Sequence, residues 1–260
     1  FCKLLAGSEG TLFFTTEIKL RCLPLPPECS GVLCVHFRSI DDALRATQII
    51  VSHRVYACEL IDDFVLNGAR RNIEQRENMS FVDGAPNSIL IGALRADNDE
   101  QLSTLATVIE KELRSAGLGY HFPFLTGEAE RKAWDLRKAG LGILNNIPGD
   151  DKPQAVIEDP AVDVADLPQY IAEFNQLLKS KYGKECVHYA HAGSGEIHLR
   201  PILNLKTAAG NKAFRDIASD IAHLVKKYRG SLSGEHGDGR LRGEFLELMV
   251  GSKNYETIKR

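Results

Sequence analysis

The stretch His191-Ala192-Gly193-Ser194-Gly195-Glu196-Ile197-His198 places two histidines on either side of a glycine turn. The run around it, residues 188–205, is typical of a β-hairpin. A hairpin that turns at Ser194-Gly195 would place His191 directly opposite His198. Directly opposed residues have Cβ atoms roughly 4.5–5.5 Å apart. The stretch therefore predicts two antiparallel strands that carry two imidazoles on one face.

A second glycine-rich segment, Ser233-Gly234-Glu235-His236-Gly237-Asp238-Gly239, adds a carboxylate and a further imidazole. Its glycines allow close approach of the backbone to a ligand. Neutral imidazoles suit zinc, iron or manganese, and a carboxylate can complete a three-ligand site with an open position. We therefore expect His191, His198 and Glu235 to bind a metal ion. His236 projects differently and is a candidate general acid or base.

Each of these side chains also has a plainer interpretation. The two hairpin histidines can be polar residues that hydrogen bonds satisfy, and Glu235 and His236 can be solvated groups of a loop. His188 lies three residues before His191 and should point to the opposite face of its strand, which makes it a poor co-ligand.

Two arginines are candidate clamps for a substrate carboxylate. Arg137 ends the segment Trp134-Asp135-Leu136-Arg137 on an expected helix, and Arg200 shares a strand face with His198. A guanidinium can bind a carboxylate through two parallel hydrogen bonds. The alternative for both is an ordinary solvent-exposed arginine.

The composition restricts the class of protein. With 260 residues the chain can form one large domain or two smaller ones, and a formal net charge of −3 argues against a dedicated nucleic-acid binder. No apolar run reaches the length of a membrane span. The six cysteines contain no C-x-x-C pair and resemble small buried hydrophobes, so we expect a reducing, cytoplasmic location. The chain starts at Phe1-Cys2-Lys3 rather than at methionine, and we interpret it as a fragment of a longer protein.

Hydrophobic patterns predict an α+β fold, an antiparallel sheet with helices packed on one face and ferredoxin-like units. A glycine turn at residues 7–14 should lead into a strand that runs to Leu23, and Pro24–Pro27 should act as a linker. The further expected strands are 32–38, 57–62, 88–95, 120–124, 184–191 and 196–203, with an extended segment at 154–164. The expected helices are 41–53, 64–76, 99–116, 128–144, 167–182, 209–228 and 240–249.

Taken in order, these motifs resemble the C-terminal half of the FAD-linked oxidases of the vanillyl-alcohol oxidase type. Within that family they are most similar to the group of glycolate oxidase, D-lactate dehydrogenase and D-2-hydroxyglutarate dehydrogenase. The segments that carry the resemblance are Gly7-Ser8-Glu9-Gly10-Thr11-Leu12 with Thr16-Glu17, Trp134–Arg137, Glu158–Val162 before Leu167-Pro168, His191–His198 and Ser233–Gly237.

The resemblance implies a division of the chain and a reaction. Residues 1–27 would be the tail end of an FAD-binding domain and a linker, and residues 28–260 the substrate-binding C-terminal domain. The whole protein would oxidise a D-2-hydroxy acid of the lactate, glycolate or 2-hydroxyglutarate type, by hydride transfer to flavin. Most contacts to FAD would come from a part upstream of residue 1, so we expect the fragment alone to be inactive.

The resemblance also implies roles for individual residues. His191, His198 and Glu235 would bind a divalent metal ion, which is expected to be zinc. His236 would remove the hydroxyl proton, and Arg137 would bind the substrate carboxylate. Contacts to FAD would come from Gly7, Ser8, Glu9 and Gly10. His236 and Arg137 are thus the candidate catalytic residues, and Arg200 is a second candidate for substrate binding.

The chain departs from the family pattern at several positions. Ser194-Gly195-Glu196 stands where related hairpins have Asp-Gly-Asn, Arg200 stands where they have asparagine, and no lysine lies near Ala161. These departures leave the identity of the 2-hydroxy acid open. The variant hairpin resembles a branch of large bacterial proteins with an iron–sulfur region after this half. The chain has no cluster-type run of cysteines, so we expect such an electron-accepting module beyond residue 260.

Two other functions stay open from the residues themselves. One is a metal-dependent hydrolase with a His/His/Glu site and bound water, which would not account for the glycine segment at residues 7–12. The other is a non-catalytic ferredoxin-like binding module in which the histidines are structural. Metal content and hydrolytic activity distinguish them. The sequence does not determine the electron acceptor or the oligomeric state.

Overall fold

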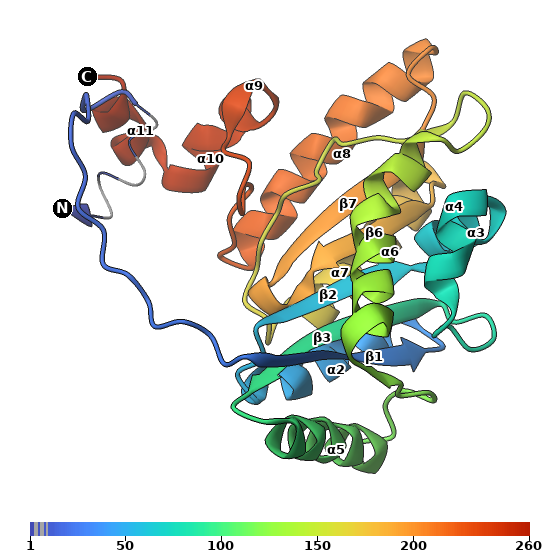
Figure 1. Cartoon of the computed structure of the whole chain (residues 1–260). Coiled ribbons are helices and arrows are strands. Elements are labelled where there is room, and N and C mark those ends of the chain that lie inside the picture. Colours follow the sequence, from blue (N-terminus) through green and yellow to red (C-terminus); the bar gives the residue numbers. More distant parts are fainter. Residues whose placement is uncertain (3–4, 6–7, 9) are drawn as a thin grey trace.

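A computed structural model describes residues 1–2, 5, 8 and 10–260 of the chain. Within these residues, seven strands form one sheet of order β4-β1-β3-β2-β6-β7-β5, and every pair of neighbours is antiparallel (Figure 1). The strands are β1 (Cys29–Phe37), β2 (Ala57–Asp62), β3 (Ser88–Ala96), β4 (Phe124–Leu125), β5 (Lys152–Pro153), β6 (Cys186–His191) and β7 (Glu196–Leu203).

Helices connect most of these strands. The α-helices are α2 (Ile40–Ser52), α3 (Asp63–Arg71), α4 (Ile73–Arg76), α5 (Asp99–Ser115), α6 (Gly127–Asn145), α7 (Leu167–Leu177), α8 (Ala208–Lys227), α9 (Gly239–Arg242), α10 (Leu246–Val250) and α11 (Ser252–Ile258). Shorter turns are the 3₁₀ segments η1 (Glu77–Met79), η3 (Ala192–Ser194) and η4 (Gly243–Phe245), and the π segment η2 (Leu178–Tyr182).

Side-chain caps explain where several long helices begin. Ser39, Asn98 and Thr207 each accept a hydrogen bond from a backbone N–H of the first turn, at α2, α5 and α8 respectively. Such caps satisfy amide groups that have no partner inside the helix. Cap signals together with amphipathic spacing place most of the expected helix boundaries within a few residues of the observed ones.

Helices cover both faces of the sheet. Leu33 and Val35 of β1 pack into a core with α2, α5, α7 and α8, whereas Val32 and Cys34 pack into a second core with α3 and α6. The expected antiparallel sheet with helices is confirmed, with one correction, because helices on one face only were expected. The physical reason is that β1 and β3 are nearly continuous apolar runs, which is typical of strands buried on both sides.

The pairing of the central hairpin differs from the expected one. His191 lies opposite Glu196, and Ala190 lies opposite Ile197, whereas His191 was expected opposite His198. The turn has four residues rather than two, because η3 precedes Gly195 in the left-handed conformation (φ +73°). A shift of two residues keeps every side chain on its face. Both histidines therefore still share the face covered by α6.

Strands β2 and β6 join the two halves of the sheet. Their ladder pairs Leu60 with Ala190 and Ile61 with Tyr189. One half is built from β4, β1, β3 and β2, and the other from β6, β7 and β5. The order of the strands across this junction places Glu59 of β2 beside His191 at the end of β6.

Two expected elements at the chain ends are wrong. No strand forms in the described residues 10–28, where Phe14, Leu20 and Leu25 are exposed, because this arm has no neighbouring strand with which to pair. The helix expected at 240–249 is broken into α9, η4 and α10. Figure 1 shows both termini on the same side of the molecule. In the described part of the chain, no helix combines the length and apolar character needed to cross a membrane.

Candidate metal centre

His191 at the end of β6 and His198 in β7 are diagonal neighbours whose ring centroids lie 5.2 Å apart. Nδ1 of His191 lies 2.8 Å from Oε2 of Glu59, and Nδ1 of His198 donates to the backbone oxygen of Glu158 at 2.5 Å. The Nε2 atoms lie 3.6 and 4.0 Å from Oε1 of Glu235. Metal-binding histidines usually anchor their other ring nitrogen in this way. The predicted trio therefore comes together with its Nε2 atoms near the carboxylate.

The environment of the two rings differs. The hydrogen bond to Glu59 raises the pKa of His191, and burial lowers the pKa of His198. A lowered pKa keeps the His198 imidazole neutral at pH 7, which is the form that binds metal ions.

Asp159 fixes the loop that carries Glu235. Its buried carboxylate accepts hydrogen bonds from Ser233 Oγ at 2.6 Å and from the backbone N–H groups of Glu235 and His236 at 3.1 and 3.0 Å. Burial alone would raise the pKa of Asp159, but these hydrogen bonds outweigh it and hold the pKa below its usual value. The backbone of the loop is thus set by Asp159, and the Glu235 side chain is left free to face the histidines. Sequence reasoning placed Asp159 in a family motif without this role.

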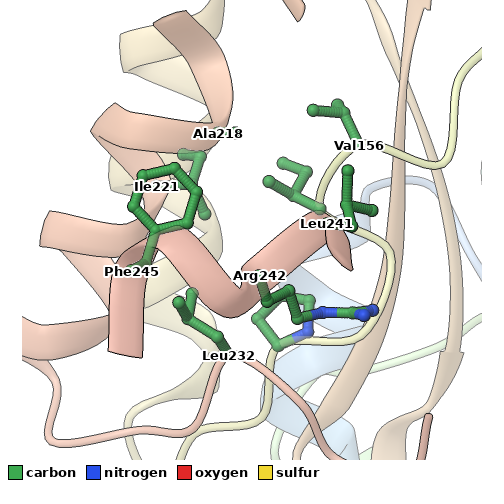
Figure 2. A pocket seen from close by; sticks show the side chains of 9 residues that line it. Val156, Ala218, Ile221, Leu232, Leu241, Arg242 and Phe245 are labelled. Atoms are coloured by element: carbon green, nitrogen blue, oxygen red, sulfur yellow. The ribbon is translucent and has the colours of Figure 1, made fainter. Parts of the chain in front are cut away.

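Arg242 and the apolar side chains around it, which we call the apolar seam, hold the other side of the same loop. Nη2 of Arg242 lies 3.5 Å from Oδ2 of Asp159, and its Nη1 donates to the backbone oxygen of Gly237 at 3.0 Å. Figure 2 shows its side chain beside those of Ile221, Leu232 and Phe245. The space that these residues leave is about 10 Å³, which is room for roughly one water molecule. The seam therefore secures the loop against α8.

Glu196 was named from the sequence only as a departure from the family pattern, with no role at this site. It lies opposite His191, is buried, and its Oε1 atom has no hydrogen-bond partner among the described residues. Burial, with a further contribution from the charge of Glu235, raises the pKa of Glu196 to about 7. Donor atoms of His191, Glu196, His198 and Glu235 all lie within 4.8 Å of one another. The two-residue spacing from His198 was a usable signal, because it places both side chains on one strand face.

His236 lies at the open side of this cluster. Its ring stacks on that of His198, with centroids 5.6 Å apart and planes 13° apart. Its Nε2 lies 3.4 Å from Oε1 of Glu235, and its Nδ1 lies 3.5 Å from Oε1 of Glu158. The ring is exposed, so it is accessible to a small molecule.

Arg137 is buried rather than solvent-facing. From α6 its Nη2 and Nε reach Oε2 of Glu59 at 2.8 and 3.1 Å, and its guanidinium lies 3.6 Å over the ring of Tyr189. The hydroxyl of Tyr189 donates to the backbone oxygen of Arg137. Glu59 thus connects the candidate clamp with the candidate ligand His191. The sequence signal for Glu59 was a charged residue inside the mostly apolar strand at residues 57–62.

Arg200 contacts Glu158, the neighbour of His236. One of its terminal nitrogens pairs with Oε2 of Glu158, and its buried Nε has no partner within the described chain. The structure thus brings Arg200 to the same side as His236. Its predicted role in substrate binding stays a prediction.

A cavity of about 440 Å³ opens beside the cluster. Its lining includes Glu59, His191, Glu196 and Glu235, together with the hairpin turn and Tyr56. A space of this size, with charged groups in its lining, can admit a small polar molecule.

Two other predicted positions lie away from this cluster. His188 points to the opposite face, as expected, where its Nε2 lies 2.9 Å from Oδ1 of Asn175. In the glycine segment, Gly7 and Glu9 lie outside the described residues. Ser8 is buried and donates to the backbone oxygen of Leu5 at 2.8 Å, and Gly10 has a left-handed φ of +76°. The contacts of this segment to FAD stay a prediction.

Comparisons with known proteins cover almost the entire chain. The profile of the family described as FAD linked oxidases, C-terminal domain, matches residues 26–260. The chain is 31% identical to a D-2-hydroxyglutarate dehydrogenase of Pseudomonas putida, over 99% of this chain and 26% of that protein. It is 26% identical to a mitochondrial D-lactate dehydrogenase [cytochrome] of Arabidopsis thaliana, over 99% of this chain and 44% of that protein.

Solved structures support the fold. A p-cresol methylhydroxylase with bound substrate superposes with a TM-score of 0.60 at 11% identity, over 89% of this chain and 49% of that one. The chain thus spans about a quarter of the D-2-hydroxyglutarate dehydrogenase that it matches and about half of this structure.

Proposed function

Because this chain belongs to the family of FAD linked oxidases, as their C-terminal domain, we propose that it is the substrate-binding part of an FAD-dependent dehydrogenase for a D-2-hydroxy acid. The carrying observation is the cluster in which Nε2 of His191 and Nε2 of His198 lie 3.6 and 4.0 Å from Glu235 Oε1. Relatives named as dehydrogenases of D-2-hydroxyglutarate and D-lactate support the substrate class.

The donor set fits a divalent cation. His191 and His198 have their Nδ1 atoms occupied, which leaves Nε2 lone pairs beside a carboxylate. Oε1 of Glu196 is a further possible ligand atom, because it accepts no hydrogen bond from the described part of the chain. We propose zinc as the first ion to test, since two imidazoles and a carboxylate suit it. A bound ion would lower the pKa of a substrate hydroxyl, as it does for water.

The protein's own groups would then bind and deprotonate the substrate. Arg137 would pair with the carboxylate, while Glu59 fixes the orientation of its guanidinium. Arg200, held by Glu158, would be a second cation at the same site. His236 would take the hydroxyl proton on a ring nitrogen, and Glu158 beside Nδ1 would hold the ring in place. The cavity of about 440 Å³ would admit a hydroxy acid of lactate to 2-hydroxyglutarate size.

FAD would accept the hydride in the whole protein. Among the described residues, nothing lies within 4 Å of a Cβ built at Gly10, which supports the proposal that Gly10 contacts a ligand. We propose that residues 1–27 belong to the end of the flavin domain, and residues 28–260 to the substrate domain. We expect the piece alone to bind FAD weakly and to be inactive.

Two broader proposals concern the surroundings of the protein. Electrons would pass from the flavin to an iron–sulfur region of a longer protein, which the hairpin variant and the greater length of the relatives support. The location would be cytoplasmic, which the six free cysteines support.

The experiment measures metal content, bound flavin and turnover on the full-length parent, with D-lactate, glycolate and D-2-hydroxyglutarate as substrates. Glu235→Gln should lose metal and turnover. His236→Ala should keep metal and flavin, and should lose turnover by about 10²–10⁴-fold. Full metal content in Glu235→Gln would contradict the ligand assignment. Metal-dependent hydrolysis of esters or peptides, without oxidation of any hydroxy acid, would support a hydrolase instead.

A further inference from the structure

Glu196 carries a buried oxygen that nothing in the described part of the chain satisfies. The residue is 6% exposed, and its Oε1 has no hydrogen-bond partner. Buried polar atoms in folded proteins almost always have a partner. Because the Oε1 atom of Glu196 lies inside a cluster of possible metal ligands, we expect its partner to be a bound ion or molecule rather than a protein group.

The position of Glu196 shows which partner would fit. Its carboxylate belongs to the group of donor atoms that lie within 4.8 Å of one another, together with His191, His198 and Glu235. Two carboxylates at this separation repel each other, and a positive ion between them turns the repulsion into attraction. Arg137, which is close enough to feel the charge of Glu196, is already paired with Glu59.

The backbone around Glu196 makes room for this arrangement. A Cβ on residue 234 would lie 2.8 Å from Cγ of Glu196, so Gly234 leaves the space that the Glu196 side chain fills. Gly195 lies so close to Val162 that a Cβ would be 1.9 Å from its backbone oxygen. The turn and the loop therefore hold Glu196 in place from both sides.

We propose that Glu196 is a fourth protein ligand of the divalent cation, which makes the site one of two imidazoles and two carboxylates. The proposal rests on the metal site proposed above and extends it. Two carboxylates neutralise the charge of a divalent ion. Four protein ligands complete a four-coordinate shell, so a hydroxy acid could bind only to an ion that accepts five or six ligands. Zinc can expand to five, and manganese favours six with oxygen donors.

The test measures the affinity of the metal-free full-length protein for Zn²⁺ and Mn²⁺ by competition with a chelator. Glu196→Gln keeps the size of the side chain and should bind both ions at least about tenfold more weakly. Glu173→Gln is the matched control, because Glu173 accepts hydrogen bonds from Lys227 and Tyr228 on the other face of the sheet. The Glu173→Gln variant should bind both ions with the affinity of the parent.

A melting curve separates loss of a ligand from loss of folding. Metal-free Glu196→Gln should melt no lower than the metal-free parent, because a buried carboxylate without a partner has been removed. The rise in melting temperature on adding Zn²⁺ should be smaller than in the parent. If Glu196→Gln does not fold, Glu196→Asn, the residue of related hairpins, replaces it with the same expected loss of affinity.

Two outcomes are decisive and differ from each other. Parent-like affinity in Glu196→Gln, with metal lost from Glu235→Gln, would overturn the role of Glu196 and leave the three-ligand site intact. Parent-like affinity in both Glu235→Gln and His191→Ala would overturn the metal site itself.

Discussion

The Oε2 atom of Glu59 lies 2.8 Å from Nδ1 of His191. The same oxygen lies 2.8 Å from Nη2 of Arg137. One carboxylate oxygen on β2 therefore orients both a candidate metal ligand on β6 and a candidate carboxylate clamp on α6. The two functions that the site needs are mechanically connected through a single side chain.

Glu59→Gln should weaken both functions. Loss of the charged partner of His191 should lower Zn²⁺ affinity by about 10–100-fold. The Arg137 guanidinium loses a charge-assisted hydrogen bond, which should destabilise the fold by about 1.5–3 kcal/mol. Chelator competition and urea unfolding measure the two effects. Glu130→Gln, at the other end of the same face, serves as control, and unchanged metal affinity in Glu59→Gln would refute the connection.

Gly234→Ala should weaken metal binding without removing a ligand. The new Cβ would lie 2.8 Å from Cγ of Glu196 and would push that carboxylate out of place. Gly243→Ala is a matched control, because a Cβ there would meet nothing within 4 Å. We expect a several-fold loss of Mn²⁺ affinity in the first variant only, by chelator competition. Equal affinities would show that Glu196 can move at no cost.

Gly195→Ala should be far more destabilising than Gly117→Ala. Both residues are left-handed, at φ +73° and +71°, so both variants bear the backbone strain of about 1–2 kcal/mol. At Gly195 the Cβ would in addition lie 1.9 Å from the backbone oxygen of Val162, whereas at Gly117 it would meet nothing within 4 Å. Urea unfolding measures the difference. Similar losses in the free energy of unfolding would mean that the turn can move away from Val162 at little cost.

Two buried histidines should each make a contribution to stability that acid removes. Burial lowers the pKa of His36 and of His188 to about 4 in the folded state, against 6.5 for a free side chain. Between these pH values the unfolded chain binds protons that the folded chain excludes. The contribution of each histidine to the free energy of unfolding should thus fall by up to about 3 kcal/mol as pH drops from about 6.5 to 4, while Asp62 and Glu196, whose pKa values burial raises to about 7, contribute in the opposite direction.

His36→Gln tests this pH dependence. His36 Nε2 accepts the backbone N–H of Asp83 at 3.3 Å and its Nδ1 faces the backbone oxygen of Cys34, so protonation would break the first contact. Urea unfolding at a series of pH values should show a slope of stability against pH that is less positive in the variant than in the parent. An unchanged slope would assign the acid sensitivity to other groups.

Much of the fold followed from local patterns. The strands at 57–62 and 196–203 have the expected bounds, and the helix expected at 99–116 ends one residue earlier. Periodicity and caps are short-range signals, which is why they suffice here. The turn length of the hairpin could not be predicted, since it depends on the contact of Gly195 with Val162, more than thirty residues earlier in the chain.

Only part of the candidate site was predicted, because local residue patterns reveal possible ligands but not long-range contacts. His191, His198 and Glu235 stand out by residue type and spacing, and the structure brings them together. Glu59 and Asp159 did not stand out, because their importance lies in what they contact across the fold. The expected strand in the N-terminal arm failed because strands depend on a neighbour that a local pattern does not reveal.

The junction between β2 and β6 has a consequence for how the protein folds. Glu59 and His191 come from the two halves of the sheet, and they meet only after β2 and β6 have paired. Contacts so distant in sequence form late, because the intervening chain must be ordered first. Glu59 anchors His191 but is not itself a proposed ligand, so a species in which the two halves have not docked should bind the ion more weakly than the folded protein.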